Sequence, residues 1–341
     1  MKRIFLQTFK FLSFLAIGLL ILWIAFRKTD FHKLAEELKY ANYSWLLLSL
    51  FFAILAFISR AMRWNILIRT LGYKPSAINS YHAVMTGYLA NIALPRVGEI
   101  TKCIALGKKE KIPVDQLIGT VIIERTIDFF SLMLITVGVL LTSSRQAVSF
   151  MNESIFLPLR EKVVLVFGVT WVLWVTMLAF ALLAFILLLK YKKALRKTKF
   201  FSKLFDTGRG VINGLKTITK LDRKWEFIGH TVFIWINYAL MTWVVVFCLE
   251  STKDITLGQA LFILVVGGLA MSAPVQSGFG VFHYAVSRAI VILAGVSLED
   301  GLAYAILAHE SQLIYVAVAG TVSFFLIFHR RNNNTAADLK A

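Results

Sequence analysis

The sequence has little charge, little proline and almost no cysteine, and each shortage excludes a class of protein. Charged residues make up 16% of its 341 residues, whereas 58% are hydrophobic. A soluble protein of this size could not cover its surface with so few charges. With five prolines in the whole chain, long apolar runs stay uninterrupted. The composition therefore predicts an all-α polytopic membrane protein.

The two cysteines, Cys103 and Cys248, lie within or beside apolar segments and form no CxxC or Cys/His pattern. The sequence therefore supports neither a disulfide framework nor a zinc site, and we expect no metal and no cofactor. The net charge of +18 would suggest nucleic acid on a soluble protein. On a membrane protein it instead marks the cytoplasmic segments, so we expect membrane lipids and no nucleic acid as partners.

Six segments have the roughly 20 apolar residues that a helix needs to cross a bilayer. They are 9–26, 43–59, 117–141, 163–189, 227–249 and 302–328. No small-residue cleavage site follows the first of them, so we expect it to be retained rather than removed as a signal peptide.

Two further apolar stretches, 78–106 and 257–295, are each interrupted by proline followed by glycine. Proline removes a backbone donor, and glycine permits sharp changes of direction. Each stretch is therefore predicted to form a re-entrant or broken-helix hairpin. The expected hinge residues are Pro95, Gly98, Pro274, Gly278 and Gly280.

The order span, hairpin, span occurs twice, at about 43–142 and about 227–328, and an odd number of crossings separates corresponding spans. Inverted repeats with broken segments are typical of secondary-transporter-like cores. The predicted organisation is a first membrane half at 1–142, an outer loop at 143–162, a second half at 163–328 and a tail at 329–341. Both termini are expected to be cytoplasmic, in the cell (inner) membrane.

Between the halves, residues 190–226 hold twelve Lys/Arg and three Asp/Glu, a local net charge of +9. Apolar residues recur through this segment at near-helical spacing. One interpretation is a basic amphipathic helix on the anionic inner leaflet. The other is the general excess of basic residues in cytoplasmic loops. The sequence leaves both open.

Four acidic residues fall inside apolar segments: Glu99, Glu124, Asp128 and Glu310. Such groups cost about 2.5–3.5 kcal/mol on insertion scales and need a partner or a cavity. Glu124 and Asp128 share one helix face, where Arg125 can reach Asp128. This pattern fits either a structural ion pair or the lining of a substrate cavity. His309 and Glu310 predict a second polar cluster at a mirrored depth.

Arg96, Glu99 and Lys102 surround the first break, where the free N–H groups of a half-helix and the nearby Arg96 suit the binding of phosphate. Arg288 is expected to act similarly beyond the second break. Glu99, with Glu124 and Asp128, is expected to bind a cationic or hydroxylated headgroup. The predicted substrate-binding set is Asn91, Arg96, Glu99, Glu124, Arg125, Asp128, Gln276, Arg288, His309 and Glu310.

Other polar residues are predicted to be structural. Arg60, Arg63 and Trp64 are expected to anchor a helix end at the lipid headgroups. His82 and His283 are expected to be hydrogen-bonded structural histidines.

The sequence resembles a known family at four places, namely residues 60–64, 91–99 and 124–128 and the second Pro/Gly hairpin. With them, residues 10–328 resemble the transmembrane domain family of lysylphosphatidylglycerol synthase, the membrane part of bacterial multiple-peptide-resistance proteins. The resemblance implies a flippase-like protein that moves a polar or charged phospholipid or polyprenyl-linked lipid between leaflets. It does not imply lysyl transfer, because the sequence given ends shortly after the last span.

Two alternatives remain open at this point. A membrane-embedded lipid-modifying transferase would use the clustered carboxylates, but no DxD-like pair, HExxH, GxGxxG or nucleophile–base set is present, and we expect no catalytic residue. A membrane scaffold for a separate lipid-modifying enzyme could use the basic segment.

Overall fold

The computed structural model describes residues 29–94, 96–142, 145–153, 221–273 and 275–328, with single positions at 23, 157, 160 and 161. Every regular element in these residues is a helix, and no strand occurs among them. The all-α fold class is therefore confirmed. Several predicted features lie outside the described residues, namely spans 9–26 and 163–189, most of the basic segment 190–226, the tail 329–341, Pro95 and Pro274.

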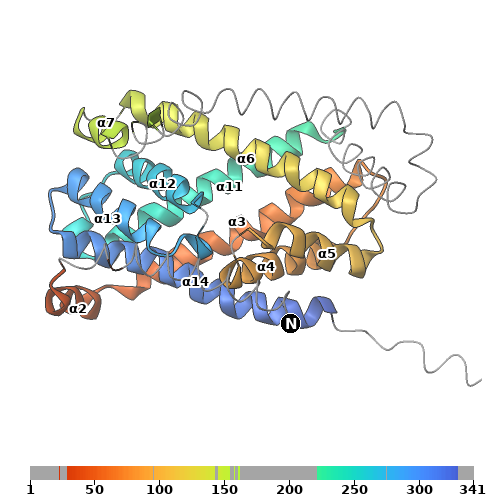
Figure 1. Ribbon diagram of the computed structural model, residues 1–341, viewed down its shortest axis with the longest axis horizontal. Helices are drawn as coiled ribbons and strands as arrows, with labels where there is room; N and C mark the ends of the chain where they lie inside the picture. Colours follow the sequence, from red (N-terminus) through yellow and green to blue (C-terminus); the bar gives the residue numbers. More distant parts are fainter. Residues whose placement is uncertain are drawn as a thin grey trace, which may run out of the picture.

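Four long helices run roughly along the long axis of the molecule (Figure 1). They are α3 (Tyr43–Arg69), α6 (Val114–Thr142), α11 (Lys224–Val244) and α14 (Leu298–Phe328). Each is long and apolar enough to cross a bilayer, α11 together with the 3₁₀ turn η2 (Val245–Cys248) that extends it. They coincide with four of the six predicted spans.

The helix α3 is longer than the sequence predicted. Its expected end was residue 59, but it continues to Arg69. No proline or glycine interrupts it before Gly72, which adopts a φ of +90° just after the helix ends. Arg60 and Arg63 therefore lie inside the helix, and their assignment to a lipid-anchoring flank is wrong.

The stretch 78–106 forms the first hairpin. Helix α4 (Ala77–Ala93) packs against α5 (Gly98–Glu110), and the two are separated by a four-residue break that includes Arg96 in the left-handed region, at a φ of +62°. The helices approach closely, since a Cβ added at Gly87 would lie 2.8 Å from the carbonyl oxygen of Gly98. The side-chain oxygen of Asn91 accepts the N–H of Gly98 at 2.7 Å and so satisfies a donor at the start of α5.

The stretch 257–295 forms the second hairpin, made of α12 (Leu257–Met271) and α13 (Val281–Ala294). The break between them contains the short turn η4 (Gln276–Gly278) and positive φ values at Gly278 and Gly280, as expected of hinge glycines. Length and apolarity alone would allow a span at Gln276–Ala294. The break leaves only the 14 residues of α13 as continuous helix, short of the roughly 20 that cross a bilayer.

The two breaks contact each other through two hydrogen bonds at exposed positions. A guanidinium nitrogen of Arg96 donates to the carbonyl oxygen of Ser272 at 2.6 Å. In the other direction, the side-chain amide of Gln276 contacts the carbonyl oxygen of Ala93 at 3.5 Å. The α4–α5 hairpin lies towards one end of the long axis and α12–α13 towards the other, so their tips touch between them (Figure 1).

The two halves share one element order, a long helix, a hairpin and a second long helix. Chain direction distinguishes them. In Figure 1, α3 runs from left to right, whereas its counterpart α11 runs from right to left. The helix α14 packs against both α4 and α13 and so joins the two hairpins. This arrangement has the inverted order that the sequence predicted.

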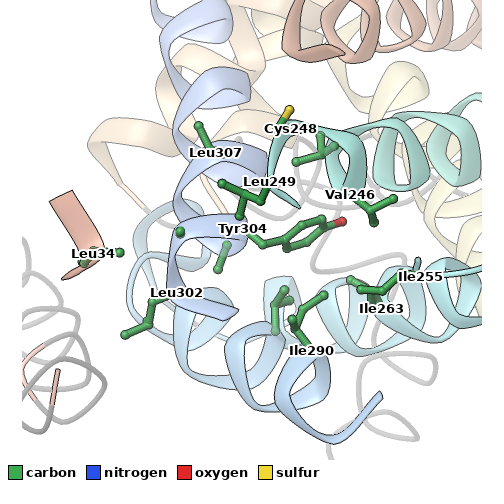
Figure 2. Close-up of a cluster of buried hydrophobic side chains, with 14 residues drawn as sticks. Leu34, Val246, Cys248, Leu249, Ile255, Ile263, Ile290, Leu302, Tyr304 and Leu307 are labelled. Carbon is green, nitrogen blue, oxygen red and sulfur yellow. The ribbon is translucent and has the colours of Figure 1, made fainter. Parts of the chain in front are cut away.

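A buried apolar cluster closes the end of the molecule that carries the second hairpin. Figure 2 shows the ring of Tyr304 among Val246, Leu249 and Ile290, which come from η2, the loop after it and α13. The hydroxyl of Tyr304 donates to the carbonyl oxygen of Thr242 at 2.7 Å. Two short helices complete the described chain, α2 (Phe31–Tyr40), which packs on α14, and α7 (Arg145–Met151), which falls in the predicted outer loop.

The close approach of α4 and α5 generates a stability prediction. The variant Gly87→Ala places a methyl group against the Gly98 carbonyl, and overpacking of this kind costs about 1–3 kcal/mol. We therefore expect a lower midpoint of thermal unfolding in detergent. In the matched control Gly138→Ala, on α6, an added Cβ meets nothing within 4 Å, so helix propensity alone should leave the midpoint unchanged or raised. Equal midpoints for both variants would contradict the tight crossing.

Candidate functional site

Six charged side chains converge between α3, α5 and α6. They are Arg60 and Arg63 from α3, Lys102 from α5, and Glu124, Arg125 and Asp128 from α6. We call this set the ionic cluster. Its centre is the carboxylate of Glu124, which is 1% exposed.

The two carboxylates of the ionic cluster are fully engaged. Glu124 Oε1 accepts from guanidinium nitrogens of Arg60 and Arg125, both at 2.9 Å, and its Oε2 accepts from Lys102 Nζ at 2.7 Å. Asp128 Oδ1 accepts from Arg63 at 2.6 Å, and Oδ2 accepts from Arg60 at 2.8 Å. Charge-assisted bonds this short are among the strongest polar contacts in proteins.

Neighbouring helices hold the cations in place. The second terminal nitrogen of Arg60 donates to the hydroxyl of Tyr238 on α11 at 2.9 Å. Trp64 is fully buried, and its indole N–H donates to Thr120 at 2.8 Å. The ammonium of Lys102 lies 4.6 Å from the centroid of the Trp64 ring, a cation–π contact. Trp64 is therefore part of the support of the ionic cluster and not, as predicted, an interfacial anchor.

The ionic cluster carries more positive than negative charge. Its four cations face two carboxylates, an excess of two positive charges, although Arg125 is partly exposed and the carboxylate of Glu99 lines both adjoining cavities. No acceptor among the described residues reaches Nε of Arg63 or Nε of Arg125. Buried charge is costly unless it is paired, so the arrangement favours an additional anion.

Two cavities adjoin the ionic cluster, and both include Glu99 and Arg125. The first is a small polar pocket inside the α4–α5 hairpin, lined by Val84, Gly87, Tyr88, Asn91, Gly98, Glu99, Lys102 and Arg125. The second is an open, mostly apolar groove of about 540 Å³ between α5 and α6, lined by Glu99, Ile100, Ile118, Val121, Ile122, Arg125, Thr126, Phe129 and Phe130. The polar pocket and the apolar groove thus share two charged lining residues, and the groove itself is suited to a hydrocarbon chain.

A second polar cluster lies at the other hairpin. Glu310 Oε1 is 3.0 Å from Nδ1 of His309 and 3.2 Å from Nε2 of His283. The other nitrogen of His309 lies 2.8 Å from the carbonyl oxygen of Ser277, in the break between α12 and α13. The sequence predicted His309 and Glu310 as a pair. It did not predict that His283, on another helix, joins them.

Comparison with known proteins agrees with this architecture. The family profile described as the lysylphosphatidylglycerol synthase TM region matches residues 11–320. The chain belongs to this family. It is therefore a multi-pass integral membrane protein, and the resemblance inferred from the sequence is confirmed. No solved structure matches the chain.

Among relatives of this family, the UPF0104 membrane protein MJ1595 of Methanocaldococcus jannaschii is 30% identical over 111 residues. The aligned part amounts to 30% of this chain and 33% of that protein. The match thus spans about a third of the length of that relative, which shows kinship of part of the chain and no activity.

In this family member, the structure brings some of the predicted binding residues together and separates others. Glu99, Glu124, Arg125 and Asp128 lie in or beside the ionic cluster. Arg96 and Gln276 join the two breaks, and Asn91 bonds to the first residue of α5 while also lining the polar pocket. Arg288 stacks on the Tyr284 ring and donates to that residue's carbonyl oxygen, both contacts being within α13.

The pairing of Lys102 with Glu124 predicts strong thermodynamic coupling. Removing one partner of a buried ion pair typically costs about 3–5 kcal/mol. Loss of Lys102 deprives Glu124 Oε2 of its donor, whereas Oε1 keeps Arg60 and Arg125. We expect Lys102→Met and Glu124→Gln each to lower the unfolding midpoint markedly, and the double variant to be far less unstable than the sum of both. The exposed pair Arg223–Glu226 is the control, because Glu226→Gln should cost about 0–1 kcal/mol. Additive single effects at Lys102 and Glu124 would contradict the described geometry.

Proposed function

We propose that this protein is a flippase-like translocator that moves an anionic phospholipid or a polyprenyl-phosphate-linked lipid between the leaflets of the cell membrane. The observation that carries the proposal is the position of the apolar groove directly beside the ionic cluster, with Arg125 belonging to both. A lipid needs both environments at once, a cationic site for its phosphate and an apolar path for its chains.

Charge placement supports a position for this site inside the hydrocarbon. Basic residues gather at the C-terminal ends of α3 and α5, among them Arg69, Lys108, Lys109 and Lys111, which supports a cytoplasmic location for that end of the molecule. Arg60 lies nine residues before Arg69 on the same helix, a rise of about 13 Å. The ionic cluster would then lie below the headgroup layer, where a lipid phosphate must pass during translocation.

The arrangement of the halves supports a route across the membrane. Two broken hairpins in inverted repeats, with their tips in contact, are the pattern that places binding sites near the midplane of secondary transporters. In this proposal the first hairpin enters from the cytoplasmic side and the second from the outer side, with both termini cytoplasmic. The contacts of Arg96 and Gln276 would open and re-form as the lipid passes.

The apolar groove and Arg125 make this proposal testable in liposomes. The side chain of Arg125 is 41% exposed, so Arg125→Gln removes a phosphate donor at the rim of the ionic cluster. Ile122→Trp fills the apolar groove without altering any charge. We expect each variant to slow headgroup translocation of a fluorescent anionic phospholipid at least tenfold, measured by loss of fluorescence to a membrane-impermeant reductant.

Two variants control for general damage. Arg223→Gln removes an exposed arginine, and Ile236→Trp adds the same bulk to the exposed face of α11. Both should translocate lipid at the rate of the unmodified protein. Unaltered rates in both Arg125→Gln and Ile122→Trp would remove the proposed lipid site.

A further inference from the structure

The second polar cluster has the composition of a metal site. His283 on α13 and His309 and Glu310 on α14 each present one ligand atom, and these three atoms lie within 4.8 Å of one another. Ligands held about 2.0–2.1 Å from a tetrahedral zinc ion are about 3.3 Å apart. The distances from Glu310 Oε1 to the two histidine nitrogens, 3.0 and 3.2 Å, are close to this value.

The orientation of His309 also matches that of a metal ligand. Its Nε2 lies 2.8 Å from the carbonyl oxygen of Ser277, a contact that requires the proton on Nε2. Nδ1 then faces Glu310 Oε1 at 3.0 Å, where a metal ion between the two atoms would replace their hydrogen bond. Metal-bound histidines commonly donate their second N–H to a carbonyl oxygen in this way, which fixes the tautomer and the ring orientation.

The cluster is buried on the side of its histidines and accessible on the side of Glu310. The imidazoles of His283 and His309 are almost fully buried, whereas the side chain of Glu310 is 31% exposed. Phe282 packs against His309 with ring centroids 5.2 Å apart, and Phe279 packs against His283 at 5.8 Å. Three protein ligands inside an apolar wall, with one accessible side, are the usual form of a zinc site that retains an open position.

We propose that His283, His309 and Glu310 bind a divalent transition metal, with Zn²⁺ as the best match. Two imidazoles and one carboxylate suit Zn²⁺, whereas Mg²⁺ and Ca²⁺ prefer sets of six or more oxygens. This proposal departs from the expectation of no metal drawn from the sequence, because His283 and His309 are 26 residues apart and come together only in the fold.

A metal here would act on the junction of the two hairpins. It would join α13 to α14, and through His309 it would hold the carbonyl of Ser277 in the second break. The neighbouring residue Gln276 contacts the carbonyl oxygen of Ala93 in the first hairpin. Metal binding would therefore stabilise the closed contact between the breaks. The inference concerns binding alone and holds whether or not the protein moves lipids.

The test is zinc binding to the full-length chain, purified in detergent with a tag that contains no histidine. After incubation with Zn²⁺ and desalting, we expect about one zinc per chain by elemental analysis, and a higher unfolding midpoint with Zn²⁺ but not with Mg²⁺. X-ray absorption should show two imidazole nitrogens and one carboxylate oxygen at about 2.0–2.1 Å.

Variants assign the site. His283→Gln and Glu310→Gln should each reduce retained zinc at least tenfold while keeping the elution volume of the unmodified protein. His32→Gln is the control, because His32 forms an exposed pair with Glu36 at 3.8 Å, and it should retain zinc fully. The proposal would be overturned if the unmodified protein retained no zinc. It would also be overturned if His283→Gln and Glu310→Gln retained as much zinc as the unmodified protein. Absence of zinc together with a pH-dependent unfolding midpoint lost in Glu310→Gln would also overturn it and assign the site to a proton.

Discussion

The first half of the molecule depends on one constraint, the neutralisation of the buried Glu124 carboxylate by surrounding cations. A carboxylate that is 1% exposed in a membrane helix is tolerable only if cations surround it, and here they come from α3, α5 and α6 itself. These bonds fix α5 against α6 and both against α3, and thereby set the position of the first hairpin. The same cations outnumber the carboxylates, so the structure that stabilises Glu124 also prepares a place for an anion.

The two halves share an architecture but differ in chemistry. Glu124 lies on the long helix that follows the first hairpin, and Glu310 lies on the long helix that follows the second. Guanidinium and ammonium groups surround the first carboxylate, whereas two imidazoles face the second. The long helices that follow the two hairpins thus carry a carboxylate surrounded by guanidinium and ammonium groups in one half and a carboxylate flanked by two histidines in the other.

Sequence patterns predicted what depends on neighbours along the chain. Apolar runs located the long helices, glycine positions located both breaks, and the four-residue spacing placed Glu124 and Asp128 on one face. The same local logic failed at Arg60, Arg63 and Trp64. A count of apolar residues ends the predicted span at the first arginine. The helix continues through both arginines because acidic partners on α6, more than sixty residues away in the sequence, neutralise them. His283 was missed for the same reason, since its partner Glu310 belongs to a different helix.

The central claim is that an anionic lipid occupies the junction of the ionic cluster and the α5–α6 groove. An electron cryo-microscopy map of the protein in nanodiscs containing an anionic phospholipid tests this most directly. The account predicts phosphate density beside Arg125 and Lys102, continuous with a hydrocarbon chain along Ile122 and Phe129. A map in which α5 and α6 close over the ionic cluster, with bound lipid only on the outer surfaces of the helices, would contradict it.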